Sequence, residues 1–248
     1  MEFINPPKEL PQNVIHKTFY SEVINHELGY NIFLPSGYGN DEKKYPVHYH
    51  LHGWTDNESS DIWILNDIYK NKQAITVFPN NSPHIENDEN IPVENIIINE
   101  FIPFIENQYR ADKNQPNRSI SGFSMGGGMA FYYAVKYPGL FGSVTACAGT
   151  YHLYYHKDYK GVGEPPSKAV ELYNMLNEER YFKEDGILNL VNKNKEKIKG
   201  TLRIKMHVGS EDVLFCDNEI MHLYLDSLHI PHEYRIIEKA GHELTKII

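Results

Sequence analysis

The stretch that decides the fold is Arg118-Ser119-Ile120-Ser121-Gly122-Phe123-Ser124-Met125-Gly126-Gly127-Gly128, in a chain of 248 residues. Its first six residues predict a short strand that runs straight into Ser124. The residues from Met125 to Tyr137 predict a helix, which Pro138-Gly139 closes. Ser124 therefore stands in the turn between a strand and a helix, with glycines on both sides.

Within this stretch, Gly122-Phe123-Ser124-Met125-Gly126 fits the pattern G-x-S-x-G. A nucleophilic serine needs a strained turn that exposes its Oγ, so the residues two places away must lack bulk. The two motif glycines supply that space, and Gly127-Gly128 lets the helix pack closely on the sheet. The Met125 N–H, at the helix N-terminus, places partial positive charge beside the serine. The pattern predicts Ser124 as a nucleophile; the alternative is a Gly/Ser turn without chemistry.

Outside this turn, strand-like and helix-like segments alternate, which predicts an α/β fold with a mostly parallel central sheet and helices on both faces. One domain over residues 1–248 fits the length. Ile96–Tyr109 predicts an amphipathic helix that Pro103 should kink, and a second helix is expected at Asn218–Leu228. The predicted strands, besides Arg118–Phe123, are Val14–Tyr20, Tyr30–Leu34, Pro46–His52, Ala74–Phe78, Phe141–Ala148, Leu202–Val208 and Glu233–Glu238.

Residues 149–200 break the alternation of strands and helices. An insertion of this length in an α/β enzyme usually forms a lid or a wall of the substrate site. We therefore expect a lid-like insert here, with chance elaboration of the surface as the alternative.

A nucleophilic serine needs a base, and the base needs an acid that orients it. Asp212 follows the strand Leu202–Val208 in the turn Gly209-Ser210-Glu211-Asp212 and is the predicted acid. Glu211 is the alternative, and Asp217 is a weaker one because it should begin the next helix. The predicted base is His242, which follows the last strand in Ala240-Gly241-His242. The remaining candidates for the base lie within or beside predicted strands and helices: His207, His222, His229 and His232.

Two backbone N–H groups should form an oxyanion hole, one from Met125 and one from the loop that follows the third strand. Leu51-His52-Gly53-Trp54-Thr55 occupies that place, and Trp54 is the predicted second donor. Aromatic side chains near the expected pocket suit a planar ring or a sugar face. The predicted substrate-binding residues are Trp54, Trp63, Tyr151, Tyr154 and Tyr155, with ordinary packing as the alternative for each.

His48, His50 and His52 alternate along one predicted strand, so their side chains share a face. Clustered imidazoles can bind zinc. However, three successive same-face residues span about 13 Å, which is too far for one tetrahedral ion. We therefore expect hydrogen-bonded histidines, no metal and no cofactor.

The composition limits the partners of the chain. A formal net charge of −9 argues against nucleic acid, and no apolar run reaches the length of a membrane span. Two cysteines, Cys147 and Cys216, make two buried thiols the favoured interpretation, with a single bridge as the alternative. The first residues lack a basic and an apolar leader region, which fits a cytoplasmic start or a secreted chain whose leader has been removed. The oligomeric state stays open.

Taken together, these segments resemble the esterase D-like branch of the α/β hydrolases, and within it the feruloyl and acetylxylan esterases of carbohydrate esterase family one. The resemblance covers most of the chain, and the serine motif followed by Met-Gly-Gly is its most specific part. The segments that carry it are Tyr49–Gly53, Phe101–Glu106, Arg118–Gly127, Phe141–Ser143, Gly209–Asp212 and Gly241-His242.

This resemblance implies hydrolysis, without a cofactor, of an ester on plant cell-wall polysaccharide, such as ferulate on xylan arabinose. The expected partner is a small-molecule or oligosaccharide ester. An acetylxylan esterase, a thioesterase similar to S-formylglutathione hydrolase and a non-catalytic carbohydrate-binding relative are the alternatives. The chain departs from the family where Glu243-Leu244 follows His242, since family members usually carry an aromatic residue and a further helix there.

Overall fold

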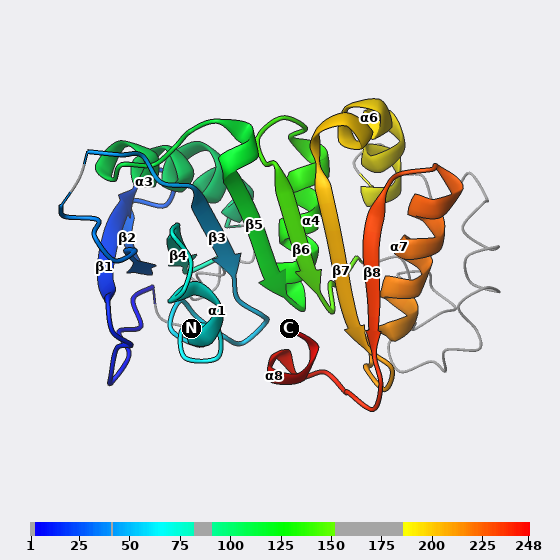
Figure 1. Cartoon of the computed structure of the whole chain (residues 1–248), viewed down its shortest axis with the longest axis horizontal. Coiled ribbons are helices and arrows are strands. Elements are labelled where there is room, and N and C mark those ends of the chain that lie inside the picture. Colours follow the sequence, from blue (N-terminus) through cyan, green and yellow to red (C-terminus); the bar gives the residue numbers. More distant parts are fainter. Residues whose placement is uncertain (1–2, 41, 82–90, 152–185) are drawn as a thin grey trace. The chain divides into compact units, whose positions relative to one another are not determined.

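The computed structural model describes residues 3–40, 42–81, 91–151 and 186–248. The chain divides into two compact units, Met1–Ile120 and Ser121–Ile248, which are described one after the other. Strand β5, Arg118–Phe123, begins in the first unit and ends in the second. Both units carry strands with helices beside them, as the alternating sequence pattern predicts (Figure 1).

Unit 1 is built on strands β1 to β4, whose order in the sheet is β1-β2-β4-β3. The β1–β2 hairpin is antiparallel in a register that pairs Val14 with Phe33 and Ser21 with His26. β2 pairs antiparallel with β4, and β3 pairs parallel with β4. Every residue of β4 is buried. The bounds are β1 Val14–Ser21, β2 His26–Phe33, β3 Val47–Leu51 and β4 Ile75–Pro79.

The predicted helix Ile96–Tyr109 is present but not uniform. A π-helical turn, Ile96–Phe101, follows the short helix α2, Val93–Asn95, and leads into α3, Ile102–Gln108. The Ile102 N–H donates to the carbonyl of Ile97, five residues back. Pro103 thus lies at the start of α3, where its missing N–H costs least. The helix accommodates the proline by this change of hydrogen-bond register. The described part of the unit also contains helix α1, Asn66–Tyr69, and the 3-10 turn Gln115–Asn117.

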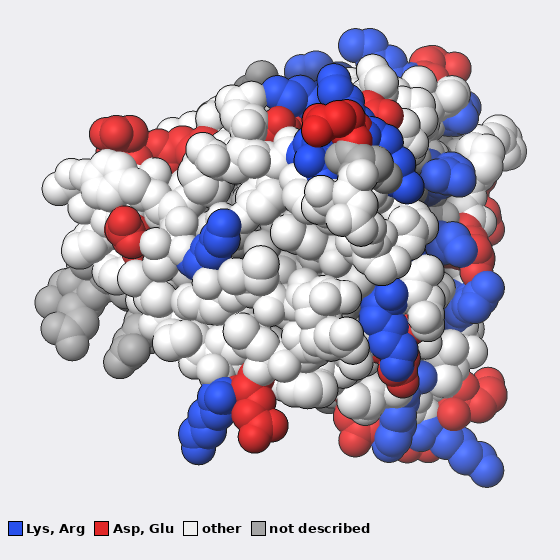
Figure 2. Space-filling model, turned by 60° about the vertical axis from the view of Figure 1, so that its left-hand side comes forward, with Lys and Arg blue, Asp and Glu red and all other residues white. Residues whose placement is uncertain are grey.

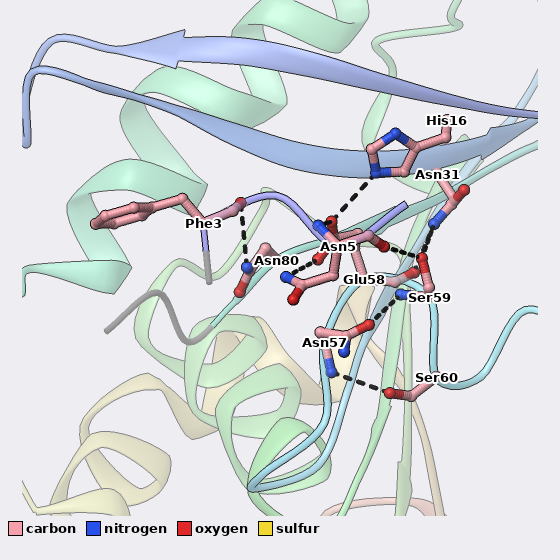
Figure 3. Close-up of polar contacts among 9 residues, drawn as sticks. All are labelled: Phe3, Asn5, His16, Asn31, Asn57, Glu58, Ser59, Ser60 and Asn80. Carbon is pink, nitrogen blue, oxygen red and sulfur yellow. Dashed lines mark hydrogen bonds and ion pairs between the residues drawn. The ribbon is translucent and has the colours of Figure 1, made fainter. Parts of the chain in front are cut away.

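A buried carboxylate fastens the N-terminal segment of unit 1 (Figure 3). Glu58 is 1% exposed and accepts hydrogen bonds from the backbone N–H and the side-chain amide of Asn5 and from Nε2 of His16. Ser59 Oγ donates to the Asn5 carbonyl at 2.6 Å. Burial raises the pKa of Glu58, but the bonds from His16 and Asn5 outweigh it and hold that pKa below 4.5. The loop after β3 is therefore tied to the chain start by an ionised group.

Unit 2 continues from the end of β5 with three parallel strands in the order β6-β7-β8. Helix α4 packs on β6, α6 packs on α4, and α7 and α8 pack on β7 (Figure 1). The strands are β6 Ser143–Cys147, β7 Arg203–Gly209 and β8 His232–Ile237, and the helices are α4 Met125–Lys136, α6 Ile187–Thr201, α7 Phe215–Ser227 and α8 Leu244–Ile247.

Part of the predicted insert 149–200 is regular structure. Helix α6 occupies its last turns and packs on α4, so these residues supply the crossover between β6 and β7 that a parallel pair requires. Residues 152–185 lie outside the described residues, and the lid remains a prediction for them.

Cys147 and Cys216 are both buried thiols that are not joined in a disulfide, which confirms the favoured interpretation. Among the described helices, none combines the length and the apolar character that crossing a bilayer requires.

Basic and acidic side chains lie intermixed around the margins of the face shown in Figure 2, with uncharged side chains across its middle.

Candidate active site

Ser124 stands in a strained turn between β5 and α4. Its backbone angles are φ 54° and ψ −119°, a conformation that residues with a Cβ rarely adopt. The turn is fixed on both sides of the serine: the Ser124 N–H donates to the Cys147 carbonyl at 2.9 Å. The Ser124 carbonyl accepts from the N–H groups of Gly128 at 3.0 Å and Thr150 at 3.1 Å. These bonds hold the strain in place and present the side chain at the start of the helix.

The glycines around Ser124 are required by close backbone approaches. A Cβ on Gly122 would lie 2.2 Å from the carbonyl oxygen of Gly126, and one on Gly128 would lie 2.0 Å from that of Thr150. Real Cβ atoms do not approach carbonyl oxygens so closely, so the backbone would have to move. The spacing of glycines that the sequence shows is therefore a steric condition for the turn.

Asp212 lies in the turn that follows β7, and its side chain is fully buried. Its carboxylate accepts the Leu214 N–H at 2.7 Å and lies 2.9 and 3.0 Å from Nδ1 of His242. The alternatives lie elsewhere: Glu211 is exposed, and the Asp217 carboxylate accepts the backbone N–H of Tyr151 at 2.5 Å. Of the three acids considered from the sequence, the structure brings Asp212 to the histidine.

The loops that carry Asp212 and His242 are joined directly. A Cβ on Gly209 would lie 2.1 Å from the Ala240 carbonyl oxygen, and the same carbonyl accepts the Glu211 N–H at 2.9 Å. The Lys239 N–H donates to Ser210 Oγ at 2.9 Å. Gly209 thus permits the contact that sets the acid beside the base, a role for which the sequence pattern carries no signal.

His242 links the acid to the serine. Its Nδ1 faces the Asp212 carboxylate, and its Nε2 lies 2.9 Å from Ser124 Oγ. The carboxylate can only accept, so Nδ1 carries the proton and Nε2 has the free lone pair. The imidazole is 29% exposed and lies against the Phe123 ring, with centroids 4.7 Å apart. Nε2 is thus placed to remove the serine proton.

Two further features support this arrangement. The short helix α8 follows His242, and its buried Leu244 and Ile247 anchor the tail where the sequence departs from the family pattern. Met125 is the first residue of α4, so its N–H has no place in the i to i−4 hydrogen-bond ladder and can bind an anion.

The aromatic residues predicted to bind substrate differ from one another in exposure. Trp54 and Trp63 lie in unit 1 and are 71% and 52% exposed, and the Trp63 indole N–H donates to the Glu9 carbonyl. Tyr151 is only 3% exposed, and its ring packs edge-on against Phe131 of α4, so it is a core residue and not an exposed aromatic platform. Tyr154 and Tyr155 lie outside the described residues.

The three histidines of β3 and its following loop each have a hydrogen-bond partner of their own. His48 Nδ1 lies 2.8 Å from Ser119 Oγ, and His50 Nε2 lies 3.0 Å from Asp61. His52 Nδ1 donates to the Gly53 carbonyl, and its Nε2 accepts the N–H of Asn81. Each imidazole thus makes its own hydrogen bonds, as expected from the spacing of the three histidines along the strand.

A model of the Esterase family matches residues 21–229. The chain is 32% identical over 143 residues to an esterase of Mycobacterium tuberculosis, an alignment that covers 53% of this chain and 31% of that protein. It is 30% identical over 175 residues, 60% of this chain, to an endo-1,4-beta-xylanase/feruloyl esterase of Xylanibacter ruminicola, of which 23% is covered. The chain thus spans about a third or less of the length of these relatives.

Among solved structures, a ferulic acid esterase superposes with a TM-score of 0.74 at 25% identity, covering 94% of this chain and 92% of that one. An S-formylglutathione hydrolase from Staphylococcus aureus superposes with a TM-score of 0.72 at 17% identity, covering 93% and 92%. These likenesses confirm the α/β-hydrolase fold and the resemblance to the esterase D-like branch. The chain belongs to the Esterase family.

Proposed function

We propose that this chain is a serine carboxylesterase that hydrolyses feruloyl (hydroxycinnamoyl) esters on plant cell-wall polysaccharide through an acyl-enzyme intermediate. The observation that carries the chemistry is the continuous hydrogen-bonded path from the buried Asp212 carboxylate through His242 to Ser124 Oγ, at 2.9 Å for each step. Ser124, the base His242 and the nearest N–H donor, Met125, all belong to unit 2.

In the first half of the reaction, Ser124 Oγ attacks the ester carbonyl and His242 Nε2 takes its proton. Asp212 holds the tautomer with Nδ1 protonated and stabilises the imidazolium that forms. The Met125 N–H donates a hydrogen bond to the developing oxyanion, and the Trp54 N–H is the second donor expected from the sequence; each donor is worth about 3 kcal/mol of barrier. His242 then protonates the leaving alcohol. In the second half, water attacks the acyl-enzyme and the acid is released.

The proposal of an aromatic acyl group rests on two lines of support. Trp54 and Trp63 expose much of their indole rings in unit 1, and such rings stack on planar groups and on sugar faces. Relatives at 25% to 30% identity are named as ferulic acid and feruloyl esterases. Aromatic stacking would be the source of selectivity over small acyl groups.

The deciding experiment compares methyl ferulate, p-nitrophenyl acetate and acetylated xylan as substrates of the wild type, Ser124→Ala and the control Ser227→Ala. Ser227 is exposed at the end of α7, and its Oγ donates to the Tyr224 carbonyl. Ser124→Ala should abolish turnover of every substrate, whereas Ser227→Ala should leave it unchanged. Full activity in Ser124→Ala would overturn the mechanism, and turnover of acetyl substrates alone would overturn the feruloyl assignment.

A second pair of variants tests the acyl group. Trp54→Ala should lower kcat/KM for methyl ferulate more than for p-nitrophenyl acetate, and Trp63→Ala is the matched comparison. Equal losses on both substrates would point to a backbone effect at Trp54 and not to stacking. Selective turnover of S-formylglutathione would favour the thioesterase alternative, and sugar binding without turnover would favour the non-catalytic one.

A further inference from the structure

Helix α7 and strand β8 of unit 2, both labelled in Figure 1, carry a group of side chains of the kinds that bind metal ions. His222 and Asp226 are one turn apart on α7, and His232 is the first residue of β8. One nitrogen or oxygen atom from each of the three lies within 4.8 Å of the other two. None of the three takes part in the proposed reaction.

His232 is held in the orientation that a metal ligand needs. Its Nδ1–H donates to the Ile230 carbonyl at 2.8 Å, so the lone pair is on Nε2. The side chain is 3% exposed, and Nε2 lies 2.7 Å from Nδ1 of His222. Metal-bound histidines are fixed in the same manner, with the other ring N–H bonded to a carbonyl or carboxylate.

His222 and Asp226 complete the group from the helix side. The His222 ring stacks on the Tyr234 ring with centroids 4.4 Å apart, which limits its rotation. The Asp226 carboxylate lies 3.6 Å from His222 Nε2 and 4.0 Å from His232 Nε2, and it is 61% exposed. The two facing nitrogens, His222 Nδ1 and His232 Nε2, can share a proton or flank a cation, and the exposed Asp226 carboxylate approaches the same pair from the Nε2 side of His222.

We propose that His222, His232 and Asp226 bind a divalent transition-metal ion, with zinc as the best match. Two imidazole nitrogens and one carboxylate oxygen are a donor set that zinc takes, with water as the fourth ligand. Bonds of about 2.0–2.1 Å at tetrahedral angles require about 3.3 Å between ligand atoms. Binding would therefore open the 2.7 Å separation of the imidazole nitrogens and draw in the exposed Asp226 carboxylate, which lies 4.0 Å from His232 Nε2. The net charge of −9 attracts cations at long range. The ion would fasten the start of β8 to α7, and so stabilise the strand that leads to His242.

The experiment uses the full chain after chelator treatment. Zinc is titrated by calorimetry into the wild type, Asp226→Asn, His222→Gln and the control His229→Asn, and thermal unfolding is followed with and without zinc. His229 is an exposed histidine in the same connection, with φ 54°, which asparagine tolerates. We expect one zinc per chain, binding weakened by about tenfold or more in both ligand variants, and no change in the control.

Two further readouts separate this site from others. Zinc should raise the Tm of the wild type and of His229→Asn, because a ligand that binds the folded state stabilises that state. Zinc should not raise the Tm of Asp226→Asn, because this variant lacks one of the proposed ligands. Cobalt should give the visible absorption of a four-coordinate site. Asp226 is exposed, so its variant should fold, and hydrolysis of p-nitrophenyl acetate checks this.

Three results would overturn the proposal. The first is no stoichiometric zinc binding at micromolar concentration, which would leave a hydrogen-bonded histidine pair beside Asp226. The second is unchanged binding in Asp226→Asn and His222→Gln. The third is binding that disappears only when His242 is replaced, which would assign the ion to the serine site.

Discussion

Each of the two units contains a histidine–aspartate pair, and the two pairs have nearly the same nitrogen–oxygen distance. In unit 2, His242 Nδ1 lies 2.9 Å from the Asp212 carboxylate; in unit 1, His50 Nε2 lies 3.0 Å from that of Asp61. The side chains of the first pair are 29% and 0% exposed, and those of the second are 3% and 5% exposed. The pairing chemistry is shared, but the surroundings of the two imidazoles differ.

His242 is partly open to solvent, and its second nitrogen faces the Oγ of a serine in a strained turn. His50 is enclosed among core residues, with its ring 5.7 Å from that of Phe78. A buried, paired imidazole contributes to stability, whereas one that also meets a nucleophile can carry a proton during a reaction. A histidine–aspartate pair therefore acquires a function from its third neighbour and its exposure.

The largest expected effect is the loss of activity when Asp212, the acid of the unit 2 pair, is replaced. Asp212→Asn should lower kcat by about 10⁴-fold, because the amide cannot hold Nδ1 protonated or stabilise the imidazolium. Steady-state kinetics on p-nitrophenyl acetate measure this loss, with the free energy of unfolding from urea titration as the companion measurement. An Asp212→Asn variant with wild-type kcat would remove Asp212 from the proposed mechanism.

The matched change in unit 1 should have the opposite signature. Asp61→Asn should lower the free energy of unfolding by about 1.5–3 kcal/mol, because it removes a charged acceptor from a buried hydrogen bond. The kcat of the folded protein should stay near that of the wild type. Urea titration and active-site titration separate the two effects, and a selective loss of kcat would show that the pairs are not distinct in role.

Lowering the pH should destabilise unit 1 through the buried His52. Burial lowers the pKa of His52 below its ordinary 6.5, and the Asn81 N–H occupies the nitrogen that would be protonated. The unfolded chain therefore binds the proton first, so this contribution to stability is complete above pH 6.5 and decreases as the pH falls below it.

The measurement is the slope of the free energy of unfolding against pH between pH 6.5 and 5. His52→Gln should reduce that slope by at most about 1.4 kcal/mol per pH unit, the value for one proton. His229→Asn, which removes an exposed imidazole, is the control. An unchanged slope in His52→Gln would mean that His52 is protonated equally in both states.

The smallest expected effect concerns the ring that lies against His242. Phe123→Leu should lower kcat several-fold, because a Leu side chain holds the imidazole less firmly than the ring at 4.7 Å, and it should change KM little. Phe131→Leu, in the core of α4, is a control that should affect stability more than kcat. An equal loss of kcat in both variants would indicate general loosening of unit 2.

Much of the fold could be predicted because its signals are local. Strand β5 has the predicted bounds, and the other strands differ by a few residues at their ends. The π-helical turn before Pro103 was not predicted, since the sequence indicates only that a proline disturbs the helix. Tyr151 was predicted to bind substrate, but its side chain packs in the core against Phe131 of α4. The sequence could not indicate this, because the exposure of a side chain depends on segments that are distant in the chain.

The sequence by itself determined the strained serine turn, because glycine spacing around Ser124 reports a steric condition within one short segment. It also indicated which loops carry the acid and the base, since these follow strands in chain order. The sequence also predicted Asp212 ahead of Glu211 and Asp217, but its contact with His242 exists only in the tertiary structure, where Gly209 lets the loop after β7 approach Ala240. The Glu58 anchor and the His222–Asp226–His232 group were also found only there. In each of these, the interacting atoms come from segments separate in the chain, and only the packing of those segments brings them together.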